Sequence, residues 1–186
     1  MQRDELKALR EDVVARAREA FARMDEAAEC NTRKVLDAMR ACRVSDAHFG
    51  VSAGYAYSDL GREKLDELYA RVFGAERALV RTQFVSGTHA LATVLFGILR
   101  PGDQLVSITG APYDTMQTVI GWAHESVGSL KEFGVDYDEL PMQGGRVDLD
   151  GIDRVVTART KLALVQRSRG YSTREPLSIE DIRTVS

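Results

Sequence analysis

Apolar side chains in the first part of the chain recur every three or four positions. Between residues 4 and 29 they are separated by Arg and Glu, which predicts one amphipathic helix with Leu6, Leu9, Val13, Ala17, Ala20, Phe21 and Met24 on its apolar side. Asn31 or Thr32 can cap a second helix, whose inward residues are Val35, Leu36, Met39 and Cys42. Neither helix carries chemistry by itself, and we expect the first to pack on a partner subunit or a later domain.

The pattern changes at residues 48–57, which are rich in glycine and aromatic residues and have no helical period. This composition predicts a loop, and binding residues concentrate in such loops. Ser58 or Asp59 then starts a helix that ends at Gly74. Arg62 lies in its first turn, where the helix dipole disfavours a cation. Arg62 therefore has either an anionic partner or a plain solvent-facing position.

From about residue 77 onward, extended and helical patterns alternate. Residues 77–81 are expected to form a short strand or extended segment, and strands are expected at 104–108, 135–140 and 161–166. Helices are expected after Ser86 and at 115–122, 148–157 and from 178 onward. This order predicts an α/β fold with right-handed crossovers and a mostly parallel sheet that helices cover on both faces. The apolar run at 161–166 predicts a strand that is buried on both faces.

The segment Val85–Ala90 lies at the start of one of these helices. Ser86, Gly87 and Thr88 would leave backbone N–H groups and hydroxyls at the positive end of the helix, which suits a phosphate group. An ordinary Ser/Thr cap on a buried helix explains the same residues. The loops 81–88, 109–114 and 166–172 all lie where ligands bind in parallel sheets, beyond the carboxyl ends of the strands.

Composition narrows the class of protein. The 186 residues suffice for a domain with a real core, and the net charge of −3 gives no support for nucleic-acid binding. No apolar run approaches the roughly 20 residues of a membrane span, and the charged N-terminus does not resemble a signal peptide. Cys30 and Cys42 form no CxxC pair, and the three histidines show no metal-ligand spacing. We therefore expect a cytoplasmic protein with reduced cysteines and without a metal.

An ordered set of short motifs resembles the methionine gamma-lyase-like or aluminium resistance family. This family is a branch of the fold-type I pyridoxal-phosphate enzymes near the cystathionine lyases. The resemblance covers essentially the whole chain and depends on the following segments: 54–57 (GYAY), 59–62 (DLGR), 73–76 (FGAE), 86–90 (SGTHA), 99–103 (LRPGD), 112–115 (PYDT), 128–134 (GSLKEFG) and 166–171 (QRSRGY).

The resemblance implies a fold and an activity. Residues 1–50 would be an N-terminal helical segment, and residues 51–186 the first part of the three-layer αβα large domain that binds the cofactor. The cofactor would be pyridoxal 5′-phosphate and the reaction a carbon–sulfur lyase reaction on a sulfur amino acid, with the β and γ positions both open. The protein would be a homodimer or homotetramer, with neither nucleic acid nor membrane as a partner.

The resemblance also implies roles for single residues. Gly87 and Thr88 match the turn that holds the phosphate, with Ser86 as a neighbour, and Tyr113 matches the aromatic ring that stacks on the cofactor. Tyr57 and Arg62 resemble a tyrosine and an arginine that reach the phosphate of a neighbouring subunit, and Tyr55 is a rival to Tyr57. Arg169 would contact cofactor or substrate, or form a structural salt bridge. His89 is expected to pack against its helix.

The catalytic lysine of such enzymes has no counterpart among the five lysines, which are Lys7, Lys34, Lys64, Lys131 and Lys161. The lysine that forms the Schiff base is therefore expected beyond residue 186, and the chain is expected to be an N-terminal fragment. Such a fragment would bind the phosphate end of the cofactor weakly and would not turn over. A non-catalytic phosphate-binding α/β module or assembly domain is the alternative, and it would make no use of Tyr113.

Overall fold

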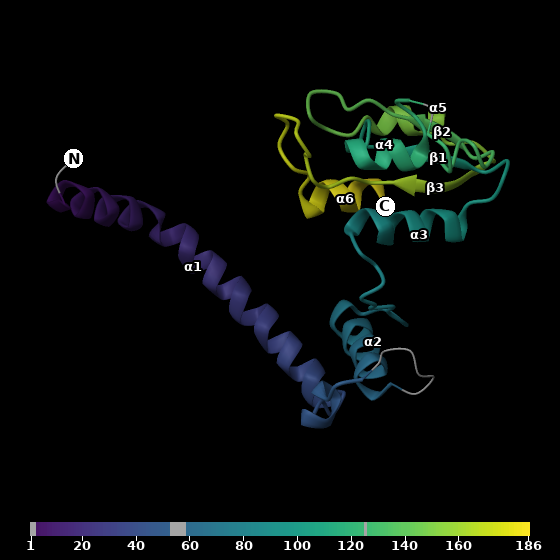
Figure 1. Ribbon diagram of the computed structural model, residues 1–186. Coiled ribbons are helices and arrows are strands. Elements are labelled where there is room, and N and C mark those ends of the chain that lie inside the picture. Colours follow the sequence, from purple (N-terminus) through teal and green to yellow (C-terminus); the bar gives the residue numbers. More distant parts are fainter. Residues whose placement is uncertain (1–2, 53–58, 125) are drawn as a thin grey trace. The chain divides into compact units, whose positions relative to one another are not determined.

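The computed structural model describes residues 3–52, 59–124 and 126–186. It divides into two compact units, Met1–Thr82 and Gln83–Ser186 (Figure 1). The boundary expected between residues 50 and 51 stays a prediction.

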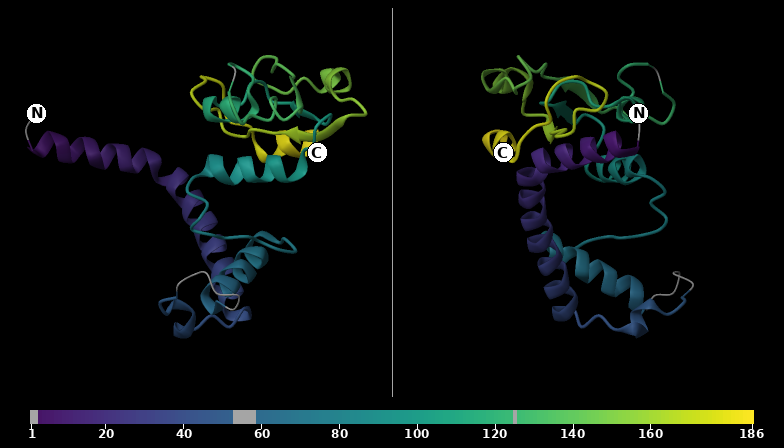
Figure 2. Two further views of the ribbon diagram at one scale, coloured as in Figure 1. Left: turned by 45° about the vertical axis from the view of Figure 1, so that its right-hand side comes forward. Right: turned by 90° about the vertical axis from the view of Figure 1, so that its left-hand side faces the viewer.

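The first unit begins with one long helix, α1 (Arg3–Ala41). The predicted break at Asn31 or Thr32 is wrong, because the helix passes through both residues without interruption (Figure 2). Neither Gly nor Pro occurs between residues 3 and 41, and Asn or Thr inside a helix costs only about 0.7 kcal/mol relative to Ala. Ion pairs one turn apart along the surface, Arg23–Glu19 at 2.6 Å and Arg33–Glu29 at 2.7 Å, support the continuous helix.

The rest of this unit folds back on the C-terminal end of α1. A short 3-10 helix, η1 (Asp46–Phe49), leads toward α2 (Leu60–Phe73). Asp59 caps α2 by accepting a hydrogen bond from the backbone N–H of Arg62 at 2.9 Å. Gly74 ends the helix in the left-handed conformation (φ 66°). Burial and the neighbouring Glu67 carboxylate raise the pKa of the Cys42 thiol. Cys42, Ala38 and Ala70 are buried in this unit.

The second unit is an α/β fold built on three parallel strands. They are β1 (Gln104–Ser107), β2 (Asp136–Glu139) and β3 (Thr160–Leu164), in the order β2-β1-β3. The connections between them carry helices: α4 (Asp114–Ile120), then η2 (Leu149–Gly151) with α5 (Ile152–Val155). The mixed α/β class and the parallel sheet predicted from the sequence are confirmed.

Two segments differ from the prediction. All four residues of β1 are buried, but the residues of β3 are alternately half-buried and exposed, with Lys161 and Ala163 exposed. The expectation that 161–166 is buried on both faces is therefore wrong. Alternate residues of a strand face opposite sides of the sheet, so the face of β3 that carries Lys161 and Ala163 is not covered. Residues 77–81 form no strand, because an extended segment becomes a strand only when it pairs with another.

The core of this unit lies between the sheet and two helices, α4 and α3 (Gly87–Ile98). Both helices contribute to one buried cluster, which contains Leu95, Leu99, Leu105, Met116, Ile120, Leu130 and Val135. Leu91, Val94 and Ile98 of α3 are exposed. A last helix, α6 (Ile179–Val185), begins at a capping box formed by Ser178 and Asp181. Among the described residues, no helix is both long enough and apolar enough to cross a membrane.

Candidate functional site

The N-terminus of α3 presents donors to open space. Ser86 caps the helix, since its Oγ accepts a hydrogen bond from the N–H of His89 at 3.1 Å. The N–H groups of Gly87 and Thr88 lie in the first turn, where a helix offers them no acceptor. A Cβ added to Gly87 would meet nothing within 4 Å. The chain itself therefore leaves room beside these donors.

A hydroxyl contact joins this turn to the start of α4. The Oγ1 atoms of Thr88 and Thr115 are 3.1 Å apart. Tyr113 is the N-cap residue of α4, so the first turn of α3 and the turn that carries Tyr113 are neighbours within the second unit. The sequence motifs contain Thr115, but its contact with Thr88 was not predicted, because the two residues are 27 positions apart.

Tyr113 is held by the loop that follows β3. Its backbone N–H donates to Gln166 Oε1 at 3.0 Å, and the N–H of Gln166 donates to Thr109 Oγ1 at 2.9 Å. The tyrosine is half-buried and packs against the core cluster. Gly170 passes close by, since a Cβ placed there would lie 3.9 Å from the Cβ of Tyr113. Gln166 and Thr109 are site residues that sequence reasoning missed, although the rule for strand carboxyl ends located their loops.

Arg169 lies in the same loop with an exposed side chain. Its carbonyl oxygen accepts hydrogen bonds from the backbone N–H and the hydroxyl of Ser172, at 3.0 and 2.8 Å. Among the described residues its guanidinium makes no ion pair, so the salt bridge considered for it does not occur there. Arg174 stabilises the loop instead, because its Nη2 donates to the carbonyl oxygens of Ser168 and Gln166 at 2.6 and 3.2 Å.

Arg62 belongs to the first unit, in the first turn of α2. A hydrogen bond from Ser52, the backbone N–H of Arg62 and the charge of Arg62 all lower the pKa of Asp59. The buried Asp59 carboxylate is therefore an anionic neighbour of this arginine. Tyr55 and Tyr57 lie outside the described residues. The structure brings Ser86, Gly87, Thr88 and Tyr113 together in one unit and leaves their relation to Arg62 a prediction.

The ring of His89 contacts its neighbours at the start of α3. The exposed His89 places its ring edge-on to that of Phe84, with centroids 5.6 Å apart. Across residues 3–52, 59–124 and 126–186, no group of three or more His, Cys, Asp or Glu side chains could hold a metal ion.

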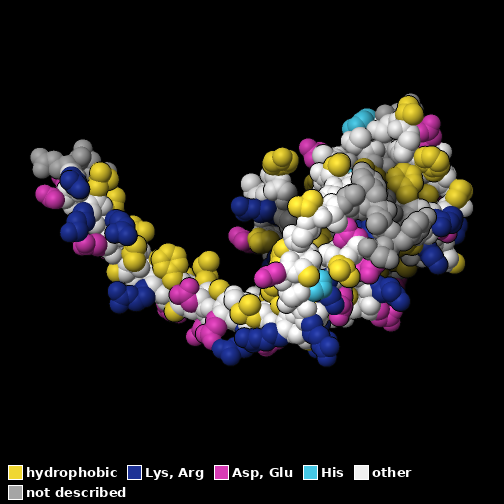
Figure 3. All heavy atoms as spheres, turned by 60° about the horizontal axis from the view of Figure 1, so that its bottom comes forward, with side chains coloured by type: hydrophobic (Ala, Val, Ile, Leu, Met, Phe, Trp, Pro, Cys, Tyr) yellow, Lys and Arg dark blue, Asp and Glu magenta, His cyan; other side chains and the backbone are white. Residues whose placement is uncertain are grey.

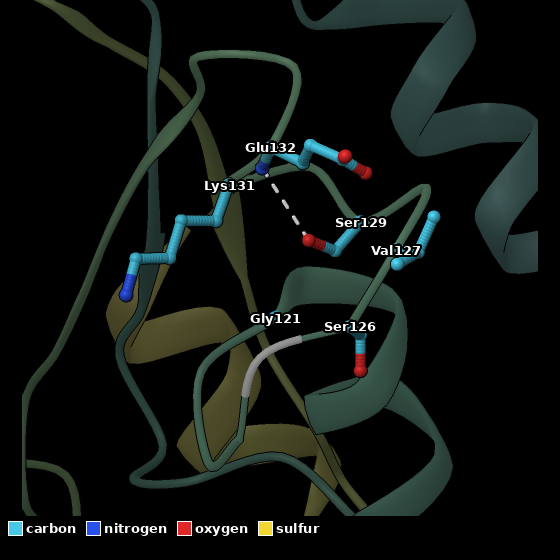
Figure 4. A pocket seen from close by; sticks show the side chains of 6 residues that line it. All are labelled: Gly121, Ser126, Val127, Ser129, Lys131 and Glu132. Atoms are coloured by element: carbon cyan, nitrogen blue, oxygen red, sulfur yellow. Dashed lines mark hydrogen bonds between the residues drawn. The ribbon is translucent and has the colours of Figure 1, made fainter.

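A surface hollow of about 520 Å³ lies at the other end of α4 (Figure 4). Its lining residues are Gly121, Ser126, Val127, Ser129, Lys131 and Glu132. Ser129 Oγ accepts a hydrogen bond from the N–H of Glu132 at 3.3 Å, and the Lys131 side chain points away from Val127. None of the residues predicted for the site lines this hollow. It is therefore separate from the α3 and α4 N-termini.

The sequence model of the methionine gamma-lyase family matches residues 6–186. The chain belongs to the methionine gamma-lyase family. It is 44% identical over 162 residues to the uncharacterized protein YnbB of Bacillus subtilis (strain 168), and this match covers 86% of the chain and 38% of YnbB.

Two crystal structures resemble this member of the methionine gamma-lyase family closely. One, from Listeria innocua, is named as a candidate cystathionine beta-lyase involved in aluminum resistance. It is 45% identical in sequence with a TM-score of 0.93, and the match covers 100% of this chain and 45% of the Listeria chain. The other, a carbon-sulfur lyase involved in aluminum resistance from Clostridium novyi NT, is 43% identical, with a TM-score of 0.90 over 98% of this chain and 44% of its own. The chain thus spans less than half the length of these relatives.

Proposed function

We propose that this chain supplies the phosphate-binding turn and the ring-stacking tyrosine of a pyridoxal-phosphate-dependent carbon–sulfur lyase. Because the chain belongs to this family, one further observation is enough to support the proposal. The Thr88–Thr115 contact sets the first turn of α3 beside the turn that carries Tyr113. A phosphorylated pyridine has the two groups that these positions would bind: an anion for the N-terminus of α3 and a flat ring for the Tyr113 phenol.

The residues present fit such a group. Gly87 has no conformational reason to be glycine, because its φ is not positive and a Cβ there would enter open space. A bound phosphate explains the glycine, since it would approach the backbone N–H groups most closely where no side chain stands. Tyr113 fits the second role because its backbone N–H is fixed by Gln166 at 3.0 Å. That bond limits how far the turn can move.

The cofactor would supply the electron sink of the reaction, drawing electrons from the α-carbon of an amino acid so that a thiol can leave. The chain's own residues would bind and orient. The N–H groups of Gly87 and Thr88, with the Ser86 hydroxyl as a neighbour, would hold the phosphate. Tyr113 would cover one face of the ring and exclude water from it. Arg169, exposed on the adjoining loop, would meet the carboxylate of the substrate.

The remaining roles complete the proposal. Arg62, and Tyr57 or Tyr55, would reach the phosphate of a neighbouring subunit in a homodimer or homotetramer. The substrate would be a sulfur amino acid, and the protein would work in the cytoplasm. Because none of the five lysines resembles the catalytic one in context, this chain alone would bind the cofactor's phosphate end and would not turn over.

Binding of pyridoxine 5′-phosphate to the 186-residue chain tests the proposal. This probe keeps the ring and the phosphate but has no aldehyde, so surface lysines cannot capture it covalently. We expect it to bind more tightly than pyridoxine or inorganic phosphate, measured by calorimetry. Gly87→Ala should abolish the phosphate-dependent part of binding while leaving unfolding by urea unchanged or slightly more difficult. Gly97→Ala is the matched control, because it is the other α3 glycine with nothing within 4 Å of an added Cβ.

Tyr113 separates the two functions considered. Tyr113→Ala should weaken binding of pyridoxine 5′-phosphate and leave inorganic phosphate unaffected, whereas Tyr113→Phe should keep most of the affinity. Equal binding of both probes, with no effect of Tyr113→Ala, would indicate a plain phosphate-binding module. Release of a 2-oxo acid from a sulfur amino acid by this chain would contradict the inferred position of the catalytic lysine.

A further inference from the structure

The N-terminal two-thirds of α1 carries an apolar stripe that its own unit does not cover. Its large members, Leu6, Leu9, Val13, Phe21 and Met24, are between 48% and 65% exposed. Figure 3 shows hydrophobic side chains in yellow along one side of the long helix at the left, beside charged residues. Burial against α2 begins only at the other end of the helix, with Ala38 and Cys42.

The spacing of this stripe reads the same in both directions. With Ala17 included, its members follow each other at intervals of three, four, four, four and three residues. At about 100° per residue, all of them fall within about 120° of the helix surface. A stripe with palindromic spacing matches a second copy of itself that runs in the opposite direction, because a two-fold interface sets residue i against j and j against i.

The antiparallel register pairs side chains of suitable size. Leu6 would lie opposite Met24 of the second copy, and Leu9 opposite Phe21. At the centre, near residue 15, Val13 would lie opposite Ala17, where a small partner lets the helices approach. The one charged residue inside the stripe is Arg10. It would lie opposite Ala20, over which its aliphatic stem can extend while the guanidinium reaches solvent.

The charges beside the stripe are complementary in the same register. Lys7 and Asp25 are 18 residues apart, which is five full turns, so they flank the stripe on the same side. Antiparallel pairing brings Lys7 of each copy near Asp25 of the other. Neither residue forms an ion pair within the described chain, whereas Arg23 already pairs with Glu19 at 2.6 Å. Lys7 and Asp25 are therefore the pair whose exchange tests the antiparallel register.

Length favours a copy of α1 over the other helices. The stripe extends about 27 Å from Leu6 to Met24. The next longest described helices, α2 with 14 residues and α3 with 12, extend only about 21 and 18 Å. Among the described helices, only α1 itself can cover the stripe from end to end.

We infer that α1 pairs with α1 of a second copy of this chain as an antiparallel two-stranded coiled coil centred near residue 15. The inference does not depend on the proposed cofactor. The 186-residue chain should dimerise reversibly, with its mass measured by sedimentation equilibrium over a range of concentrations. A monomer throughout that range would overturn the inference.

Charge exchange tests the register. Lys7→Glu and Asp25→Lys should each raise the dimer dissociation constant about two- to thirtyfold, because each removes two symmetry-related ion pairs and creates two like-charge contacts. The double variant should restore most of the affinity. Glu26→Lys is the matched control, since it makes the same change of charge on the opposite side of the helix. Equal effects of Asp25→Lys and Glu26→Lys, or no recovery in the double variant, would contradict the register.

Disulfide trapping tests the direction of the helices. In a Cys30→Ser background, Val13→Cys and Ala17→Cys chains should cross-link with each other when mixed and oxidised, and each alone should cross-link far less. A parallel pair in register would give the reverse result, with homodimeric cross-links of each variant. All substitutions are at surface positions of a helix, and circular dichroism checks that the helix content is unchanged.

Discussion

Gly121 ends α4 in a conformation and a space that only glycine fits. Its φ is 82°, and its N–H donates to the carbonyl oxygen of Gln117 at 2.8 Å. A Cβ at this position would lie 2.4 Å from Ser129 Oγ and 2.8 Å from Ser129 Cβ. Ser129 is 3% exposed, so it cannot move away without disturbing its surroundings.

We expect Gly121→Ala to lower the free energy of unfolding of the second unit by about 2–5 kcal/mol. The left-handed conformation costs a residue with a Cβ about 1–2 kcal/mol, and overpacking a buried site costs about 1–3 kcal/mol more. Since small domains have about 5–15 kcal/mol in total, this is a large fraction. Trp122, the only tryptophan, contacts Tyr137 at a centroid distance of 4.9 Å. Its fluorescence therefore reports urea unfolding of this region.

Ser129→Gly separates the two contributions. In the double variant the conflict with Ser129 is absent and only the milder approach to Lys131 Cβ, at 3.3 Å, remains, so Gly121→Ala should then cost close to the conformational part, about 1–2 kcal/mol. The difference between the two costs is the coupling energy of a double-mutant cycle. A cost of Gly121→Ala below 1 kcal/mol, or one that Ser129→Gly does not reduce, would refute this account of the turn.

Three further predictions follow from pairs and positions elsewhere. Hydrogen bonds from Arg81 lower the pKa of Asp66, so Asp66→Asn should lower the free energy of unfolding by about 1–3 kcal/mol. This loss should be complete above pH about 4 and should disappear as the pH falls through the lowered pKa of Asp66. Urea unfolding midpoints measured over a range of acid pH values check it. Asn31→Ala should raise the stability of α1 by up to about 0.7 kcal/mol by thermal denaturation, whereas a capping residue would lose stability. Burial and the hydrogen bond to Glu139 raise the pKa of Tyr137, so Glu139→Gln should let this phenol ionise closer to pH about 10 in an absorbance titration.

The order of elements in the second unit could be predicted because turn signals separate the strands from the helices. Expected strands at 104–108 and 135–140 correspond to β1 and β2 within one residue at each end. The helix expected at 115–122 appears as α4, which Gly121 ends. Local patterns sufficed here because turn residues and apolar runs act on their own neighbours.

The burial of a strand and the continuity of a helix were less predictable, because both depend on what surrounds the element. The run at 161–166 is as apolar as a central strand, yet alternate residues of β3 are exposed because one face of the strand is not covered. Asn31 and Thr32 are favourable caps, but a cap forms only where the chain leaves the helical conformation, and nothing in α1 makes it do so. In both places the residue type is compatible with two structures, and packing decides between them.

The contacts that fix Tyr113 depend on a detail of strand pairing that no motif marks. Gln104 pairs with Thr160, but the next residue, Leu105, pairs with Leu162, so the register of β1 and β3 shifts by one residue. Without the shift, β3 and the loop after it would move by about 3.3 Å and its side chains would exchange faces. The backbone N–H of Gln166 would then lose its bond to Thr109 Oγ1 (2.9 Å), and the Gln166 side chain would lose its bond to Tyr113. Sequence patterns can therefore place the loops of this site at one edge of the sheet, while the pairing of atoms within it follows from a register that only the folded chain defines.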